Sequence, residues 1–240
     1  MVWNNQQTIK ASATSVDAGL RSYMNRVYSL MSMGIGLTGI VTYVIASIPA
    51  LLVPIAVGPM KWVLFISVLG LGWFAPQIIM TKSRTAAGIA FWVYSALWGA
   101  MMAPMIAFFL QSQQGAYDIA RAFLITSVMF AGSSMYGYVT KKDLSALGRF
   151  FMMAMIGLVV AMIANIFIGS SIMSLGISAL VVLFSAGITA YETQMIRNMY
   201  YQLPHRGAVS RFAILGAFML YGTFVSMFIH ILNIMAQMRR

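Results

Sequence analysis

Seven apolar stretches, separated by short polar or basic segments, make up most of the chain. Each holds roughly 18 to 25 residues, enough for an α-helix to cross a hydrocarbon core about 30 Å thick. A backbone in lipid must satisfy its own hydrogen bonds, so these stretches are expected to be helical. The pattern predicts an all-α integral membrane protein, a bundle of seven transmembrane helices. The spans are placed near residues 27–48, 61–80, 86–110, 120–139, 147–168, 174–197 and 211–237.

The first 26 residues are polar, with several Asn, Gln, Ser and Thr side chains. They lack the basic-then-apolar order of a cleavable signal peptide. We interpret residues 1–26 as a cytoplasmic N-terminal tail with an interfacial helix from Val16 to Arg26. Residues 27–240 are interpreted as one seven-span membrane domain.

The segment from Pro49 to Pro59 is apolar but contains three prolines and Gly58. Proline interrupts a helix because it lacks a backbone N–H and its ring collides with the preceding turn. We therefore expect an interfacial loop here rather than part of a span.

Composition excludes a soluble protein, since 61% of the residues are hydrophobic and only 8% are charged. Soluble domains average about 45–50% and about 25%, respectively. Cysteine is absent, which removes disulfides, thiolate metal sites and cysteine nucleophiles from consideration.

The net charge of +11 would suggest nucleic acid in a soluble protein, but the basic residues here lie between apolar runs. In such positions they set membrane orientation and meet anionic lipid headgroups, so no nucleic-acid partner is expected. Counting Lys and Arg on alternate sides gives eleven against four, which predicts a cytoplasmic N-terminus and an external C-terminus. A six-span arrangement with a re-entrant last segment stays open as an alternative. The richer side holds Lys10, Arg21, Arg26, Lys82, Arg84, Lys141, Lys142, Arg149, Arg197, Arg206 and Arg211, and the poorer side Lys61, Arg121, Arg239 and Arg240.

Residues Gly34 to Gly39 match the GxGxxG pattern of dinucleotide-binding folds, but they lie inside the first span. The pattern binds a cofactor only between a strand and a helix, so we interpret these glycines as sites of close helix packing. The 22 methionines are interpreted as adaptable apolar filler rather than metal ligands. No cofactor and no metal site are expected.

Glu192 is the one acidic residue that falls within a predicted span. The other three acids are assigned to the tail (Asp17) and to loops (Asp118 and Asp143). A carboxylate at membrane depth is costly and marks a functional candidate by default. The alternative is a carboxylate at a helix end that reaches toward Arg197 or another cytoplasmic base.

Polar side chains form a stripe on each of the last two predicted spans. Each residue of a helix is rotated by about 100° from the one before it, so residues three, four or seven positions apart share one face. On the sixth span they fall within an arc of about 60°, and on the seventh within about 80°. The stripes either line a hydrated path with Glu192 near its cytoplasmic mouth or simply hydrogen-bond across packed helices. We favour packing for the serines and threonines and function for Glu192 and His230. The sixth-span stripe is Ser174, Ser178, Ser185, Thr189 and Glu192, and the seventh-span stripe is Thr223, Ser226, His230, Asn233 and Gln237.

Catalysis is not expected from one carboxylate. Intramembrane proteolysis needs paired aspartates or a Ser/His arrangement, and a zinc site needs several His or acidic ligands. We therefore expect that the protein is not an enzyme.

Four segments resemble the BAX inhibitor motif family, in its bacterial YccA-like branch. They are Val16–Tyr28 (VDAGLRSYMNRVY), Tyr136–Leu144 (YGYVTKKDL), Gly187–Gln194 (GITAYETQ) and Ile214–Tyr221 (ILGAFMLY). The resemblance implies a seven-span bundle with the last helix at its centre. It also implies a proposed role as a pH-sensitive calcium leak that modulates other membrane machinery.

In that family two aspartates, on the sixth and seventh helices, are thought to share a proton near the cytoplasmic mouth. The first corresponds to Glu192, but Leu220–Phe224 (LYGTF) places Thr223 where the second would stand. A Glu–Thr pair cannot share a proton as two carboxylates do. A hydrogen bond from Thr223 to Glu192 is the simpler arrangement, and Arg84 becomes a candidate counter-charge for Glu192.

Two functions follow from these observations. The first is a channel-like leak for cations in a bacterial inner membrane, with Ca²⁺ as the transported ion. Glu192 would titrate at the mouth of this channel. Its path would be lined by Thr189, Ser226, His230 and Asn233. The second is a non-conducting membrane protein that binds and modulates a membrane protease or a translocation assembly. The missing second acid favours the second function, whereas the retained Glu192 and the polar stripes favour the first.

Overall fold

The computed structural model describes residues 2–202 and 209–238, with side chains described from residue 18 onward. All regular structure in these ranges is helical. The helices are α1 (Val2–Ser47), α2 (Pro49–Ala56), α3 (Met60–Thr81), α4 (Arg84–Leu110), α5 (Gly115–Val139), α6 (Ser145–Ile168), α7 (Ser171–Tyr201) and α8 (Val209–Met238).

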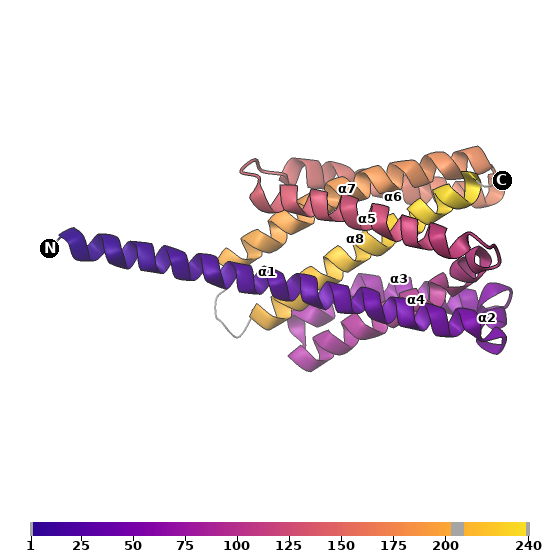
Figure 1. The fold of residues 1–240 in the computed structure, drawn as a ribbon, viewed down its shortest axis with the longest axis horizontal. Coiled ribbons are helices and arrows are strands. Elements are labelled where there is room, and N and C mark those ends of the chain that lie inside the picture. The colour runs from indigo at the N-terminus through magenta and orange to yellow at the C-terminus, as the bar shows by residue number, and fades with distance from the viewer. Residues whose placement is uncertain (1, 203–208, 239–240) are drawn as a thin grey trace.

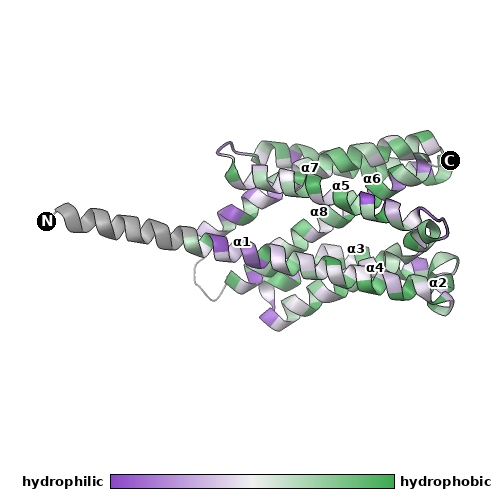
Figure 2. Ribbon diagram, in the orientation of Figure 1, coloured by the Kyte–Doolittle hydropathy of each residue, from purple (hydrophilic) through white to green (hydrophobic). Residues whose placement is uncertain are grey.

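Seven of these helices are long and apolar enough to cross a membrane, which confirms the all-helical class and the count of seven spans. The span in α1 covers Ala18–Ser47, and the other six coincide with α3 to α8. Hydrophobic residues make up much of each of these helices, as the green parts of the ribbon in Figure 2 show. Phe167 and Ile172, for example, are 86% and 83% exposed, as expected where lipid replaces water as the solvent.

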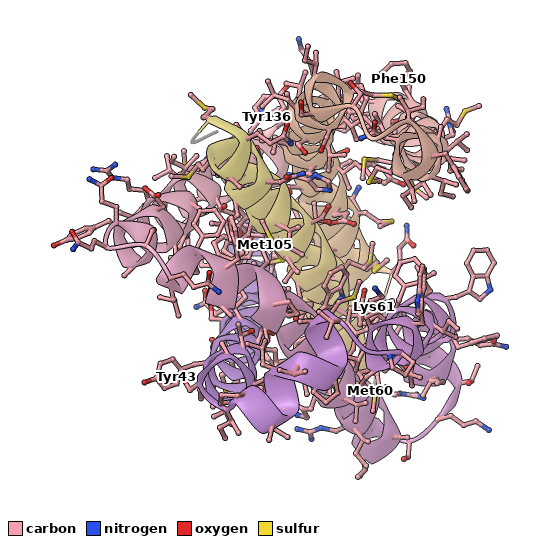
Figure 3. All side chains as sticks on the ribbon, turned by 90° about the vertical axis from the view of Figure 1, so that its right-hand side faces the viewer. Tyr43, Met60, Lys61, Met105, Tyr136 and Phe150 are labelled. Atoms are coloured by element: carbon pink, nitrogen blue, oxygen red, sulfur yellow. The ribbon has the colours of Figure 1, made fainter. Side chains whose placement is uncertain are left out.

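Helix α8 lies at the centre of the bundle, which confirms the predicted position of the last helix (Figure 1). It contacts α1, α3, α4, α5 and α7, and half of its residues are buried. Viewed from one end, α8 crosses the middle while Tyr43 of α1 and Phe150 of α6 point outward (Figure 3). Helix α6 contacts α7 alone among the described helices and lies at the periphery.

The two ends of α8 lie at opposite ends of the bundle. Near its start, Arg211 donates hydrogen bonds to the carbonyls of Met80 and Lys82. Near its end, Gln237 donates to Ser174 at the start of α7. The re-entrant alternative for the last segment is therefore wrong, because α8 passes from one end of the bundle to the other.

The first helix differs from the expectation of a separate interfacial helix at residues 16–26. Helix α1 runs without a break from Val2 to Ser47, so the boundary placed after Arg26 lies inside it. The first proline of the chain is Pro49, and nothing before it prevents the helix from continuing. The division into a cytoplasmic tail and a membrane domain stays a prediction.

The proline-rich segment after α1 also differs from the expected loop, because Pro49–Ala56 forms the short helix α2. Pro49 stands in the first turn, where its missing N–H has no helical partner to lose. The chain then turns at Gly58, where a Cβ atom would lie 2.5 Å from the Pro54 carbonyl oxygen. As expected, the segment is not part of a span.

Close packing at the glycines of the first span is confirmed for only one of them. A Cβ atom on Gly34 would lie 2.6 Å from the ring of Phe91 on α4. Gly36 and Gly39 face open space instead. Other glycines provide tight contacts that the pattern did not single out, among them Gly137, where a Cβ would lie 2.1 Å from the Ala190 carbonyl oxygen on α7.

Gly137→Ala is expected to destabilise the bundle, because the added methyl group must push α5 away from the backbone of α7. Overpacking of this kind costs about 1–3 kcal/mol. Gly132→Ala on the same helix meets nothing within 4 Å and should be neutral or gain up to about 1 kcal/mol of helix propensity. Thermal unfolding of both variants in detergent measures the difference, and equal midpoints would contradict the assigned contact.

Candidate functional site

Glu192 and Thr223, between which the sequence analysis expected a hydrogen bond, are in direct contact. Glu192 lies on α7 and is half-buried, and Thr223 lies opposite on α8 and is 9% exposed. The Thr223 hydroxyl donates a hydrogen bond of 2.6 Å to Glu192 Oε2. Thr223 Oγ1 also lies 3.3 Å from the Met219 carbonyl oxygen of its own helix. The structure thus contains the Glu–Thr hydrogen bond in place of a carboxyl pair.

The polar stripes of α7 and α8 face each other and form a seam toward the other end of the bundle. His230 Nδ1 lies 3.2 Å from the Ser178 hydroxyl, and Asn233 donates to the same hydroxyl at 3.0 Å. Gln237 donates to Ser174 at 2.9 Å. We call the ten residues of the two stripes the polar seam. Its members are Ser174, Ser178, Ser185, Thr189 and Glu192 of α7 and Thr223, Ser226, His230, Asn233 and Gln237 of α8.

The middle of the polar seam is held differently from its ends. Thr189 is fully buried and donates to the Ser185 carbonyl of its own helix at 2.8 Å. Ser226 is half-buried and takes no part in the cross-helix bonds described above. Hydroxyl groups that bond back to the preceding turn are satisfied locally. Thr189 is therefore satisfied within α7, while direct pairing between α7 and α8 occurs at the two ends of the seam.

Arg84 does not act as the counter-charge of Glu192 in this structure, so that prediction is wrong. It is the first residue of α4, and its side chain is exposed. Among the described side chains, the one ion pair within 4.0 Å joins Arg121 to Asp118. An exposed guanidinium gains little by leaving water for a half-buried carboxylate.

Arg197 does not pair with Glu192 either. Its guanidinium donates to the carbonyl oxygens of Tyr138 and Thr140, at the end of α5. This removes the alternative in which Glu192 reaches toward Arg197. The Glu192 carboxylate is therefore held by a neutral hydroxyl, with no described basic side chain within 4.0 Å.

Asp118 lies in a helix rather than in the loop to which the sequence assigned it. Helix α5 begins at Gly115, five residues before the predicted start, so Asp118 stands in its first turn and is 5% exposed. Arg121 lies 3.9 Å away, one turn later. Acidic residues are favoured at helix N-termini, where the helix dipole is positive, and this signal could have found the correct start.

A clamp on the α5–α6 loop is the main feature that the sequence analysis missed. Gln194 accepts a hydrogen bond from the Leu144 amide at 2.9 Å and donates to the Lys142 carbonyl at 2.7 Å. Arg197 holds the other side of the loop through the two carbonyls described above. The segments YGYVTKKDL and GITAYETQ, singled out separately in the sequence, thus form one contact beside Glu192.

Asp143 stays exposed in this loop and closes a local turn. Its carboxylate accepts a hydrogen bond from the Ser145 amide at 2.9 Å. The hydrogen bonds from Ser145 hold the pKa of Asp143 below its usual value. The side chain therefore stays ionised at neutral pH, at the start of α6.

A second hydrogen-bonded chain links α1, α5 and α7 next to Glu192. The Tyr28 hydroxyl lies 2.6 Å from Ser134 Oγ, which lies 2.9 Å from Thr193 Oγ1. Thr193 is fully buried and directly follows Glu192 in α7. The position of Glu192 is thus determined from both sides, by Thr223 on α8 and through Thr193 by α5 and α1.

The described residues contain no group of three or more His, Asp or Glu side chains that could hold a metal ion. A single carboxylate with one hydroxyl neighbour supplies fewer ligands than the six to eight oxygens that Ca²⁺ takes in a stable site. The arrangement can attract a passing cation or exchange a proton.

The sequence profile of the family described as "Inhibitor of apoptosis-promoting Bax1" matches residues 20–240. An uncharacterized protein of Deinococcus radiodurans is 37% identical, and the alignment covers 98% of each chain. The inner membrane protein YbhL of Escherichia coli K12 is 32% identical over 92% of this chain and 94% of its own. An uncharacterized membrane protein of Streptococcus pyogenes serotype M1 is 33% identical over 92% of this chain and 95% of its own.

Gln194→Leu should release the α5–α6 loop, because it removes the acceptor of the Leu144 amide and the donor to Lys142. Each buried polar group left without a partner costs about 1–3 kcal/mol. Hydrogen exchange at the Leu144 amide should become faster, while Asn198→Leu, at an exposed site one turn further along α7, should leave it unchanged. Equal exchange in the two variants would show that Gln194 does not hold the loop.

Proposed function

The chain belongs to the family of the inhibitor of apoptosis-promoting Bax1, and on this basis we propose that it is a pH-sensitive cation leak with Glu192 as its titrating group. It is a membrane protein, with a relative named as an inner membrane protein in Escherichia coli. The proposed location is a bacterial inner membrane with the N-terminus in the cytoplasm, and the proposed cargo is Ca²⁺.

One observation carries the proposal: a carboxylate lies between the central helix and α7 without a described cation beside it. An ionised group at membrane depth is costly unless it is paired or hydrated. The cost is relieved when Glu192 takes up a proton or when a cation approaches its free oxygen. Protons and cations thus compete for one group, which supports a flux that depends on pH.

The polar seam supports a path for the ion from Glu192 toward the opposite end of the bundle. Its amide, imidazole and hydroxyl groups bond to one another across α7 and α8. A cation that passed along the seam would have to replace these bonds with its own coordination or with water. Opening would therefore require α7 and α8 to separate, and the Thr223–Glu192 bond would break at the same time.

The proposed activity is transport without catalysis and without a bound cofactor. Thr223, Ser226, His230, Asn233 and Thr189 are the path residues, and each acts through a hydrogen bond or a lone pair rather than through a reacting atom. Arg84 has no role in this proposal, because its exposed side chain does not pair with Glu192.

A second function is favoured by the direct bonding within the seam, which is typical of helices that simply pack. In this case the protein would not conduct and would act on a membrane protease or another membrane assembly. The peripheral helix α6 contacts only α7 among the described helices and offers an apolar face to such a partner.

Calcium efflux from proteoliposomes that contain the purified protein separates the two functions. For a leak, the wild type conducts between pH 5 and 8, and Glu192→Gln flattens the pH dependence because its side chain cannot titrate. Thr223→Asp should shift the midpoint, because two neighbouring carboxylates couple their titrations. Asp143→Asn removes an equal charge from an exposed loop and should leave the midpoint unchanged.

A wild type that is tight at every pH would overturn the leak. If Thr223→Asp alone then conducts, the chain has lost transport through the missing acid, and the regulatory function is supported. If Glu192→Gln and Asp143→Asn give the same profile as a conducting wild type, the leak does not titrate at Glu192.

A further inference from the structure

Helices α1 and α5 both pack against α8, but their backbones stay apart from each other. Among the described residues, no Cα atom of α1 lies within 8 Å of a Cα atom of α5. In Figure 1 the central helix α8 is visible between them. Two cavities lined by residues of both helices form a crevice between them, and α8 lines one of these cavities.

A cavity of about 510 Å³ occupies this crevice at the end of the bundle that carries the α5–α6 loop. Its wall on α1 contains Arg21, Asn25 and Tyr28, and its wall on α5 contains Met135 and Tyr138. Met135 is 67% exposed, and the side chains of Arg21 and Asn25 are exposed as well. The cavity thus opens sideways, toward the space that lipid fills.

The lining of the cavity changes from polar at its rim to apolar deeper in the bundle. Arg21, near the start of the membrane span of α1, and Tyr138, near the end of α5, place a guanidinium and a phenol hydroxyl at the rim. Deeper in the cavity the lining becomes apolar, with Phe130 and Ala131. A cationic donor group above an apolar cleft is complementary to a phosphate with an acyl chain attached.

The width of the crevice favours a lipid acyl chain over a helix of a partner protein. The Tyr28 hydroxyl reaches across from α1 to bond Ser134 on α5 at 2.6 Å, so one tyrosine side chain spans the gap at its floor. A further helix needs about 8–10 Å between axes on each side. An acyl chain is far thinner than a helix, so the space fits a lipid better than a helix of a partner protein.

The opposite half of the crevice is apolar and holds a separate cavity of about 380 Å³. Thr38 and Thr42 line it, but both hydroxyls donate to backbone carbonyls within the bundle. This cavity therefore presents hydrocarbon to whatever enters it. The separation of α1 from α5 thus continues beyond the Arg21 cavity.

We propose that the α1–α5 crevice binds an anionic phospholipid of the leaflet at the α5–α6 loop end, with its phosphate on Arg21 and an acyl chain against Phe130 and Ala131. Arg21 supplies a planar fork of donors that matches phosphate oxygens. Asn25 and Tyr138 add donors at the rim. The lipid would lie beside Tyr28, whose hydroxyl leads through Ser134 to Thr193.

Lipid retained by the purified full chain is the direct test, measured by native mass spectrometry after extraction from vesicles of equal phosphatidylglycerol and phosphatidylcholine. The wild type should retain phosphatidylglycerol in preference. Arg21→Gln should reduce this preference about fivefold, as expected for one basic residue near an anionic headgroup. Arg26→Gln removes the same charge from an exposed site on α1 that does not line the cavity, and should retain the preference.

A second pair of variants tests the acyl-chain part of the site. Ala131→Leu fills the cavity and should reduce retention of both lipids, whereas Gly132→Leu faces open space on the next residue and should not. Thermal unfolding of the four variants serves as the control that each of them is folded. Equal behaviour of Arg21→Gln and Arg26→Gln, no preference in the wild type, or a retained polypeptide in place of lipid would each overturn the proposal.

Discussion

The enclosure of α8 by its neighbours is the constraint on which the rest of the structure depends. The hydrocarbon core of a bilayer offers no hydrogen bonds, so polar side chains within a span must find partners inside the bundle. Among the helices that the structure describes, α8 alone contacts five other long helices, and the polar stripe of α8 lies against that of α7. The apolar outer helices α3 and α6 can face lipid because α8 and α7 hold the polar groups between them.

Around Glu192 the enclosure is reinforced by contacts from several elements. Thr223 bonds the carboxylate itself, Thr193 ties the next residue to Ser134, and Gln194 holds the α5–α6 loop one residue further on. Three consecutive residues of α7 therefore face three different neighbours. A movement of α7 that frees Glu192 must also disturb the loop or the link to α1, which couples the carboxylate to the surface at that end of the bundle.

Predictions from sequence patterns failed where the contacts of a residue depended on its neighbours in space rather than on its residue type. Arg84 was a reasonable counter-charge by its predicted level in the membrane, but its side chain is exposed and forms no ion pair with Glu192. Asp118 was assigned to a loop because hydropathy marks the apolar core of a helix and not its polar first turn. The clamp by Gln194 was missed because hydrogen bonds from a side chain to a distant loop have no periodicity along the chain.

The sequence by itself determined the helical class and the seven spans, because length and hydropathy are properties of local sequence. The central last helix and the pairing of Glu192 with Thr223 were expected from the resemblance to the BAX inhibitor motif family. Tertiary structure decided which polar groups meet. It joined the two stripes, left Glu192 without a basic partner among the described side chains, and kept the backbones of α1 and α5 apart. The physical reason is that hydropathy specifies which helices enter lipid, whereas the rotation and tilt of each helix depend on packing with its neighbours.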